Sequence, residues 1–362
     1  MKSWDAVIIG AGVIGLSLGW RLRLEGLRVL LIEKGEPGRE ASYAAGGMIA
    51  HCDPHLAPEL KPLALASAQM YPEFVAELRQ ESGVSPDLRE QGTIAFFPAD
   101  EQLDCADARR IEPAEVTALE PLFTHTTKSF GSQAYLLPER SVDPRALCHA
   151  LVEAAKTRGI DFVTGSAVTE IEVQSGRATG VKTAHSSYAA GCVINCAGAW
   201  AAQIQPLPIP TRPAKGQMVC VVPAPETKSG TPLIQHVIRA PEVYLIPRSD
   251  GRILLGATLE DAGFDKRTDA DTIERLYRFA TEAVPAIGQM RIHDAWAGLR
   301  PASPDDRPIL GETSLPRYYA ATGHYRDGIM LAPITARLMT QLILSKPLQF
   351  SLDAFSPRRF AR

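Results

Sequence analysis

The sequence lacks the features that mark several classes of protein. Its 362 residues carry 38 Lys and Arg against 41 Asp and Glu, a balance that gives no reason to expect nucleic acid or an anionic membrane surface as a partner. No uninterrupted apolar run approaches the roughly 20 residues of a membrane-spanning helix. The apolar stretch at residues 6–18 is cut by three glycines and has no basic segment before it, unlike a secretory signal. We therefore expect a soluble, cytoplasmic protein.

The six cysteines are scattered, and none belongs to a CxxC pair. Neither a disulfide framework nor a zinc site is expected from this spacing. The segment "HCDPH" places His51, Cys52, Asp53 and His55 close together, but the sequence shows no second group of ligands. We interpret it as a plain loop and expect no metal. The short basic end "SPRRFAR" is interpreted as a solvated tail.

What the sequence does contain begins with a complete βαβ unit. Residues 5–10 form the continuous apolar run of a buried parallel strand, and Gly10, Gly12 and Gly15 follow as GxGxxG. These glycines permit a tight turn, close approach of backbone to a pyrophosphate, and packing of helix on strand. Glu33 ends the next strand about 20 residues later, where a carboxylate can bind ribose hydroxyls and repel a 2′-phosphate. The unit predicts NAD or FAD binding and disfavours NADP.

A run of small residues follows this unit. Ser42 can bond a phosphate, and Ala45, Gly46 and Gly47 would let the backbone before Met48 lie against a flat, bulky ligand. The same residues fit a flexible loop that leads into Met48. Spacing alone leaves both interpretations open.

The rest of the chain alternates between two kinds of pattern. With 45% hydrophobic residues, it can form two domains. Helices are predicted at 62–82, after the N-cap Asp143, and near 271–283, whereas the period-two strands within 206–290 indicate a mixed or antiparallel sheet with one face off the core. The dinucleotide-binding domain is expected at 1–82, 141–205 and 291–362, and the substrate domain at 83–140 and 206–290.

Arg300 ends an apolar run, Trp296 to Leu299, that reads as a buried strand. An arginine is rarely buried unless it is paired. Asp305 and Asp306 follow closely and could pair with it in a surface loop. The alternative is a carboxylate that arrives from solution, and spacing alone does not decide between them.

The chain resembles the D-amino-acid oxidase family of flavoproteins, most closely its glycine oxidase branch. The matching runs include "AVIIGAGVIG", "ASYAAGGM", "SVDPRAL", "INCAGAWA", "VYLIPR", "WAGLRPASPDDRPILG" and "ATGHYRDGIMLAP", which extend from end to end in the family's order. The resemblance implies an α/β fold: a doubly wound FAD-binding domain, built on the GxGxxG βαβ unit, with an inserted mixed or antiparallel sheet as the substrate-binding domain. It also implies that FAD is held non-covalently.

The implied reaction is oxidative deamination of glycine and small D-amino or N-methyl amino acids such as sarcosine. Hydride transfer to the flavin gives an imine and then glyoxylate or a keto acid, while O2 becomes H2O2; a role in thiamine thiazole synthesis follows by family analogy. The resemblance also suggests a homo-oligomer. Two alternatives stay open: a dehydrogenase that passes electrons to a quinone or protein acceptor, and a non-catalytic dinucleotide-binding or nucleic-acid-modifying flavoprotein.

The resemblance also assigns roles to individual residues. Arg300 matches the arginine that binds the substrate carboxylate, and Tyr244 the tyrosine that assists it; Arg248 is the alternative carboxylate ligand on that strand. The implied cofactor contacts are Gly10, Gly12, Val13, Ile14, Gly15, Glu33, Lys34, Ser42, Ala45, Gly46, Gly47, Met48, Val168, Gly198, Trp200, Gly323, His324, Arg326, Asp327, Gly328 and Ile329.

Three positions bear on how far the family pattern applies. Gly46 stands where the branch usually has alanine, which is expected to loosen packing at the flavin face. Asp327 replaces asparagine and adds a negative charge near a helix N-terminus, unless its carboxylate caps that helix. Glu242, near the expected pocket mouth, is expected to disfavour acidic substrates. His324 is interpreted as a turn residue rather than a catalytic acid.

Overall fold

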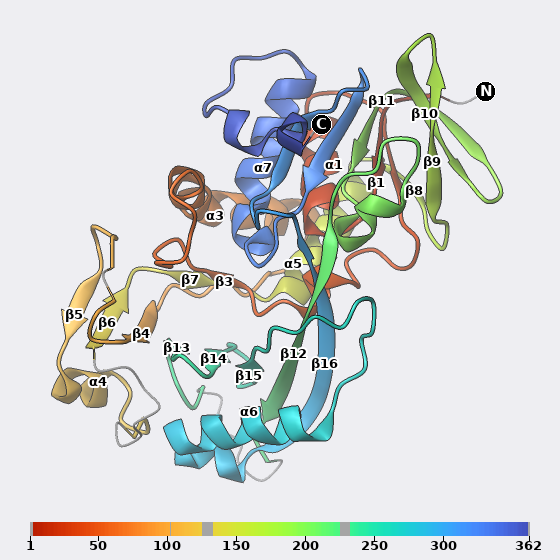
Figure 1. Ribbon diagram of the computed structural model, residues 1–362. Coiled ribbons are helices and arrows are strands. Elements are labelled where there is room, and N and C mark those ends of the chain that lie inside the picture. Colours follow the sequence, from red (N-terminus) through yellow and green to blue (C-terminus); the bar gives the residue numbers. More distant parts are fainter. Residues whose placement is uncertain (1–2, 102, 125–132, 225–231, 361–362) are drawn as a thin grey trace.

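The computed structural model describes residues 3–101, 103–124, 133–224 and 232–360 (Figure 1). Within these residues, two eight-stranded sheets and a small two-stranded one form the framework. The two long strands of one large sheet, β12 (Arg212–Val222) and β16 (Arg291–Ala302), extend toward the other large sheet, and helix α6 (Ala270–Ala283) lies against the sheet that contains them (Figure 1). The small sheet pairs β3 (Met48–Ile49) with β7 (Arg140–Ser141).

The first sheet has a parallel centre. Its order is β17-β18-β11-β1-β2-β8, and the neighbours pair in parallel except for the antiparallel edge strand β17. The strands are β1 (Ser3–Ile9), β2 (Val29–Ile32), β8 (Asp161–Val163), β9 (Val168–Gln174), β10 (Arg177–Thr183), β11 (Ser187–Asn195), β17 (Ile309–Glu312) and β18 (Tyr318–Thr322). The associated helices are α1 (Val13–Leu24), α2 (Ala41–Ala44), α3 (Lys61–Ser82), α5 (Pro144–Thr157) and α7 (Gly328–Ile343), with 3-10 turns η1 (Gly198–Gln203), η3 (Asp353–Phe355) and η4 (Pro357–Phe360).

Strand β1 is apolar on both sides because both faces of this sheet are covered. Ala6 and Ile8 pack in one core cluster with residues of α1, α3, α5 and α7. Val7 and Ile9 point the other way, into a second cluster with residues of β9 and β10. The continuous apolar run therefore reflects a doubly covered strand, as the sequence predicts.

The second sheet is antiparallel except where β13 meets β4. Its order is β16-β12-β15-β14-β13-β4-β6-β5. The strands are β4 (Thr93–Phe97), β5 (Arg109–Ile111), β6 (Gln133–Leu137), β12 (Arg212–Val222), β13 (Val237–Arg239), β14 (Tyr244–Pro247), β15 (Ile253–Gly256) and β16 (Arg291–Ala302). Helices α4 (Pro113–Leu119) and α6 (Ala270–Ala283) and the turn η2 (Pro285–Gln289) accompany it.

The two faces of this sheet differ, as its period-two alternation predicts. Val219 and Val221 of β12 pack in the core cluster that includes α6. The residues that alternate with them, Met218 and Cys220, face the opposite side of the sheet. They belong to a cluster that includes Met48, which follows the glycine-rich segment. The expected α/β fold with a mixed sheet beside a parallel one is confirmed. The division into five domain segments stays a prediction; β16 lies in the second sheet along its whole length.

One expectation about the cysteines is wrong. Cys52 and Cys105 form a disulfide, with Cα atoms 5.4 Å apart and a sequence separation of 53. The other four cysteines are free and buried, as core residues are. The pair was not evident from spacing because it joins the segment after β3 to the segment between β4 and β5.

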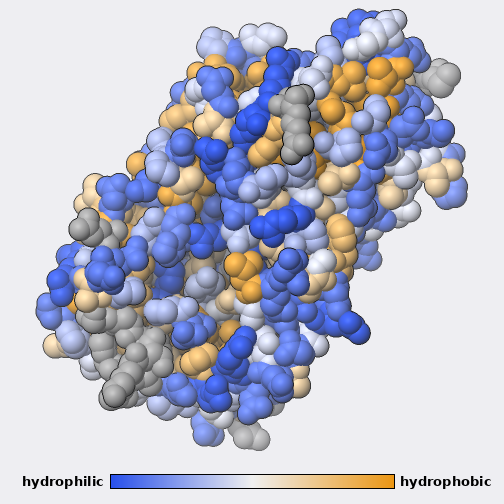
Figure 2. Space-filling model, viewed as in Figure 1, coloured by the Kyte–Doolittle hydropathy of each residue, from blue (hydrophilic) through white to orange (hydrophobic). Residues whose placement is uncertain are grey.

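The molecular surface is mostly hydrophilic on the face that Figure 2 shows, and hydrophobic residues are gathered there only in limited groups. A folded protein normally exposes some apolar residues at its surface. None of the described helices combines the length and apolar character that a membrane span requires.

Asp143 connects the two sheets and offers a test of the fold. Its Oδ1 accepts hydrogen bonds from the backbone N–H groups of Arg145 (2.9 Å) and Ala146 (3.4 Å) at the start of α5. Its Oδ2 accepts one from Arg252 (2.8 Å), which precedes β15 in the second sheet.

We expect Asp143→Ala to lower the free energy of unfolding by about 1–2 kcal/mol, because it removes a helix cap. Asp143→Asn retains the capping oxygen and should lose less. Urea unfolding of both variants at pH 7 measures this. Equal stability of Asp143→Ala and the unmodified protein would show that the cap contributes nothing.

Candidate functional site

The glycine-rich turn after β1 leads directly into the N-terminus of α1. Gly10 has φ +96°, and a Cβ there would lie 2.5 Å from the carbonyl oxygen of Cys196, so only glycine fits. Gly12 is the N-cap residue of α1 and, as a glycine, has no side chain with which to cap the helix. The Val13 N–H donates to Ser42 Oγ at 2.9 Å, which brings the second predicted segment against the first. A helix N-terminus of this kind favours a phosphate.

Glu33 is held beside this turn by backbone donors. Its Oε2 accepts from the N–H of Ala11 (2.8 Å) and its Oε1 from that of Gly35 (3.0 Å). Its side chain is nearly buried but lines the cavity. Each carboxylate oxygen keeps a further lone pair, so Glu33 can still accept a hydrogen bond from a hydroxyl group.

One long cavity, between the first sheet's glycine turn and the second sheet, brings most of the predicted residues together. Two predicted residues, Gly15 and Gly323, do not line it. A Cβ on Gly15 would lie 2.0 Å from the Gly10 carbonyl oxygen, so Gly15 allows α1 to pack closely on the turn. The predicted residues that do line it are Gly10, Gly12, Val13, Ile14, Glu33, Lys34, Ser42, Ala45, Gly46, Gly47, Met48, Val168, Gly198, Trp200, Tyr244, Arg300, His324, Arg326, Asp327, Gly328 and Ile329.

Charged and aromatic side chains border the cavity near Glu33. Lys34 Nζ lies 3.1 Å from the centre of the Trp200 ring and pairs with Glu40 at 3.0 Å. Glu40 also pairs with Lys266, which follows β15. Phe264 of the same segment packs on Trp200 with ring centres 5.3 Å apart. The segment after β15 thus reaches back to the first sheet.

The small residues before Met48 permit close packing. A Cβ on Gly298 of β16 would lie 2.4 Å from the Cβ of Ala44, so the Ala44 methyl group packs directly against the backbone of β16. A Cβ on Gly46 would lie 2.6 Å from Cδ1 of Ile246. Ile246 therefore occupies the space that an alanine would use, and the expected loosening at Gly46 is wrong.

Arg300 projects from β16 across β12 into the cavity. A Cβ on Gly216 would lie 2.2 Å from Arg300 Nη1, so the guanidinium passes over a position that only glycine leaves open. Its Nη1 donates to the carbonyl oxygens of Thr258 (2.9 Å) and Lys215 (3.3 Å). Burial lowers the pKa of the Arg300 guanidinium from its ordinary value. Among the carboxylates of the described residues, none forms an ion pair with it.

The two aspartates that could have paired with Arg300 have other partners. Asp305 pairs with Arg307 and with Arg359, both at 2.9 Å. Asp306 pairs with Arg212 at 3.6 Å. Arg359 is largely buried, so the basic end of the chain is not a solvated tail over its described part, and that expectation is wrong.

Tyr244 and Arg239 line the cavity together, although only Tyr244 is predicted from the sequence. They face each other across the β13–β14 pair, so their side chains share a face of the sheet. The position of Arg239 beside Tyr244 follows from the register of the β13–β14 hairpin, which the sequence pattern does not reveal. Arg248 is fully buried and donates to the Gly46 carbonyl oxygen at 2.6 Å outside the cavity lining. Arg248 is therefore not placed to bind a substrate.

Of two further acidic residues, Asp53 and Glu242, only Asp53 lies in the wall of the cavity. Asp53 lines it and pairs with Arg326 at 3.5 Å, a contact that the sequence does not reveal. Glu242 is exposed and does not line the cavity. The expected repulsion of acidic substrates by Glu242 thus has no basis in its position.

Asp327 and His324 flank the start of α7 at the cavity wall. Asp327 is the N-cap, but its side chain makes no cap hydrogen bond. Burial raises the pKa of the Asp327 carboxyl to about 7, against the opposing attraction of Arg326. His324 Nε2 lies 3.0 Å from Thr335 Oγ1, and burial lowers the pKa of this imidazole to about 3. His324 is therefore neutral at pH 7, as a structural turn residue would be.

The fold and the glycine turn match a known family over nearly the whole chain. The family pattern described as FAD dependent oxidoreductase (DAO) covers residues 5–342. The chain belongs to this FAD-dependent family. The cofactor is therefore FAD, and the N-terminus of α1, Glu33 and the small-residue wall would fit its pyrophosphate, ribose and flat ring.

The chain is similar to glycine oxidases in both sequence and structure. A glycine oxidase of Geobacillus kaustophilus is 32% identical over 98% of this chain and 97% of its own length. The crystal structure of glycine oxidase from that organism superimposes with a TM-score of 0.90, over 100% of both chains at 31% identity.

Two further relatives show how the family varies. The hydrogen cyanide synthase subunit HcnC of Pseudomonas aeruginosa is 30% identical over 99% of this chain and 97% of its own length. The bifunctional protein ThiO/ThiG of Synechocystis is 33% identical over 98% of this chain but 54% of its own. This chain thus spans about half the length of the bifunctional relatives it matches.

The raised pKa of Asp327 makes a pH-dependent prediction. Because its folded value of about 7 exceeds the ordinary 3.8, the charge on Asp327 destabilises the folded protein increasingly as pH rises between these values. In protein stripped of cofactor, Asp327→Asn should raise the melting temperature on the order of 2–4 °C at pH 8 and by less at pH 4.5. Differential scanning fluorimetry measures both.

The exposed Asp107 provides the control, and Asp107→Asn should give no pH-dependent gain. A gain for Asp327→Asn that is equal at both pH values would contradict the raised pKa.

Proposed function

We propose that this protein is an FAD-dependent oxidase of glycine and small D-amino or N-methyl amino acids such as sarcosine. The observation that carries the proposal is the guanidinium of Arg300. It lines the FAD cavity, and within the described residues its hydrogen bonds go only to backbone carbonyl oxygens. The nearby aspartates have other partners. A positive group in such a place favours a carboxylate that enters with the substrate.

The geometry around Arg300 fits a small amino acid. A guanidinium offers two parallel donors to a carboxylate, and exclusion of water strengthens that pair. The Thr258 and Lys215 carbonyl oxygens fix the orientation of the guanidinium through Nη1. Tyr244 lines the same cavity and supplies a hydroxyl group as a second contact. These residues would hold the carboxylate and so direct the α-carbon toward the flavin.

Positioning is the main contribution that these side chains can make. Bound FAD supplies the hydride acceptor. His324 is engaged with Thr335, so it is not free to act as a base at the cavity wall. We infer that the substrate enters the reaction as a neutral amine and that Arg300 and Tyr244 hold it while the bond to the α-hydrogen breaks.

The electron acceptor and the assembly are further parts of the proposal. We infer that O2 takes the electrons and leaves as H2O2, with a homo-oligomer as the working form. The resemblance to glycine oxidase supports the oxidase reaction, and the resemblance to ThiO/ThiG supports a role in thiazole synthesis for thiamine. A dehydrogenase with a quinone or protein acceptor is the second candidate. The relative HcnC, named as a subunit of hydrogen cyanide synthase, supports only that proteins of this similarity differ in their reactions.

Arg300→Ala tests the carboxylate role. We expect KM for glycine or sarcosine to rise by about 100-fold or more, since loss of a desolvated charge partner costs about 2–5 kcal/mol. The yellow flavin colour should be retained, because the nearby FAD contacts come from other elements. Steady-state kinetics and the flavin absorbance of the purified variant measure the two effects.

Arg212→Ala is the matched control, because Arg212 lies on the neighbouring strand β12 but is exposed and pairs with Asp306. Its KM should stay unchanged. An unchanged KM for Arg300→Ala, or a variant that no longer holds FAD, would mean that Arg300 is structural.

A further inference from the structure

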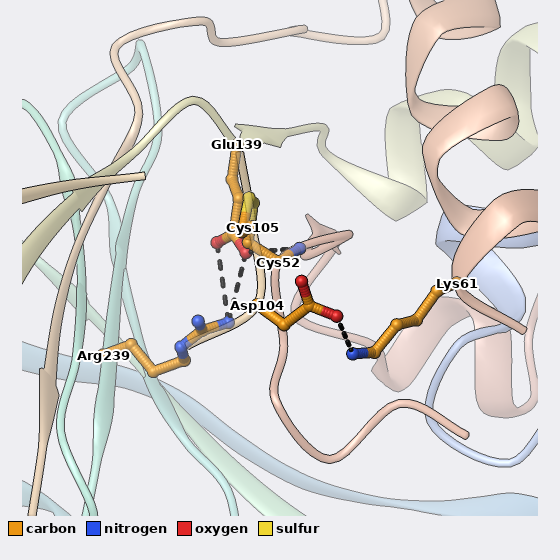
Figure 3. The surroundings of a disulfide bond; sticks show 6 residues. All are labelled: Cys52, Lys61, Asp104, Cys105, Glu139 and Arg239. Carbon is orange, nitrogen blue, oxygen red and sulfur yellow. Dashed lines mark hydrogen bonds and ion pairs between the residues drawn. A yellow bond between two sulfur atoms is a disulfide. The ribbon is translucent and has the colours of Figure 1, made fainter. Parts of the chain in front are cut away.

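The disulfide between Cys52 and Cys105 lies beside a third side chain that can bind a metal. One ring nitrogen of His51 and the sulfur atoms of both cysteines all lie within 4.8 Å of one another. Cys105 comes from the segment between β4 and β5, so the group is assembled only in the folded chain (Figure 3). Within the described part of the chain, it is the one group of His, Cys, Asp and Glu side chains that meets such a spacing.

His51 provides an independent sign that a ligand is missing. Its Nδ1 is buried, and no described residue gives it a hydrogen-bond partner. A buried imidazole nitrogen without a partner loses its hydration without compensation. A metal ion would supply the missing interaction, since imidazole nitrogen and thiolate sulfur are the preferred ligands of zinc.

We propose that the Cys52–Cys105 disulfide is the oxidised form of a zinc site, in which His51, Cys52 and Cys105 bind Zn²⁺ when both cysteines are reduced. A phosphine or dithiol breaks the S–S bond and is itself oxidised, leaving two thiols. Zn²⁺ then displaces one proton from each thiol. Peroxide reverses the process: it takes two electrons from the thiolates, forms the S–S bond, releases Zn²⁺ and becomes two hydroxide ions.

The surroundings allow a four-coordinate zinc with a water ligand. Cys52 is buried, whereas Cys105 is only half-buried, so solvent can reach the fourth position. The nearby acidic side chains are already engaged. Asp104 pairs with Lys61 at 2.8 Å, and Glu139 accepts from Arg239 and from the Cys52 N–H (Figure 3).

The site is joined to the wall of the FAD cavity. Glu139 accepts hydrogen bonds from the Cys52 N–H at 3.3 Å and from Arg239 Nη1 at 3.4 Å, and Arg239 lines that cavity. Asp53, the next residue after Cys52, lines it too and pairs with Arg326. Bound zinc and the disulfide would therefore hold this part of the wall in different ways.

The experiment counts zinc in the FAD-loaded, untagged full-length protein. One sample is reduced with a phosphine and one is left oxidised; both are equilibrated with Zn²⁺, passed over a desalting column and analysed by mass spectrometry for metal and for alkylated thiols. We expect about one zinc per chain after reduction and none in the oxidised sample. His51→Ala and Cys105→Ser should lose the zinc.

His55→Ala is the matched control, because His55 lies in the same segment and is exposed. It should bind zinc like the unmodified protein. The proposal is overturned if reduced protein retains no more zinc than Cys105→Ser, or if His51→Ala and His55→Ala bind equally. A disulfide that resists the reductant until the protein unfolds would also overturn it. Flavin absorbance shows that each variant is folded, and none of these outcomes depends on the proposed oxidase activity.

Discussion

The central physical constraint on the cavity is electrostatic, because the positively charged guanidinium of Arg300 lies in its wall. A charge removed from bulk water needs a partner, and backbone carbonyl oxygens satisfy only part of its donors. Asp305 is held by Arg307 and Arg359, so it cannot serve. We therefore propose that an anion binds at this point, and membership of the FAD-dependent family favours an amino-acid carboxylate as that anion.

The cavity exists because two differently built sheets face each other across it. The parallel sheet supplies the N-terminus of α1 and Glu33, whose positions follow from strand and helix geometry. The antiparallel sheet supplies Tyr244 from β14 and Arg300 from β16. Close approach of the two parts requires glycine at Gly298, where a side chain would collide with Ala44, and Gly216 leaves room for the Arg300 side chain within the second sheet. The proposed ribose-binding residue Glu33 and the proposed substrate-binding residues Tyr244 and Arg300 thus come from different sheets.

Local rules explain what the sequence could predict. The glycine turn and the Asp143 cap depend on backbone geometry within a few residues, and the position of Glu33 follows from the geometry of the βαβ unit; all three lie in the elements where the sequence predicts them. The partner of Asp305 lies 54 residues later in the chain, and Cys105 lies 53 residues after Cys52. Such contacts depend on how the layers meet, which periodicity does not report. The same limit hid Ile246, which fills the space beside Gly46.

The most direct test of the central claim is an anaerobic titration of the purified protein, followed by its flavin absorbance. Glycine, sarcosine and D-alanine are added in turn without air. The account predicts that at least one of them bleaches the flavin, and that readmitted air restores the colour with formation of peroxide. A flavin spectrum that none of the three changes would leave the FAD fold intact and contradict the assignment of Arg300 to a small amino-acid substrate.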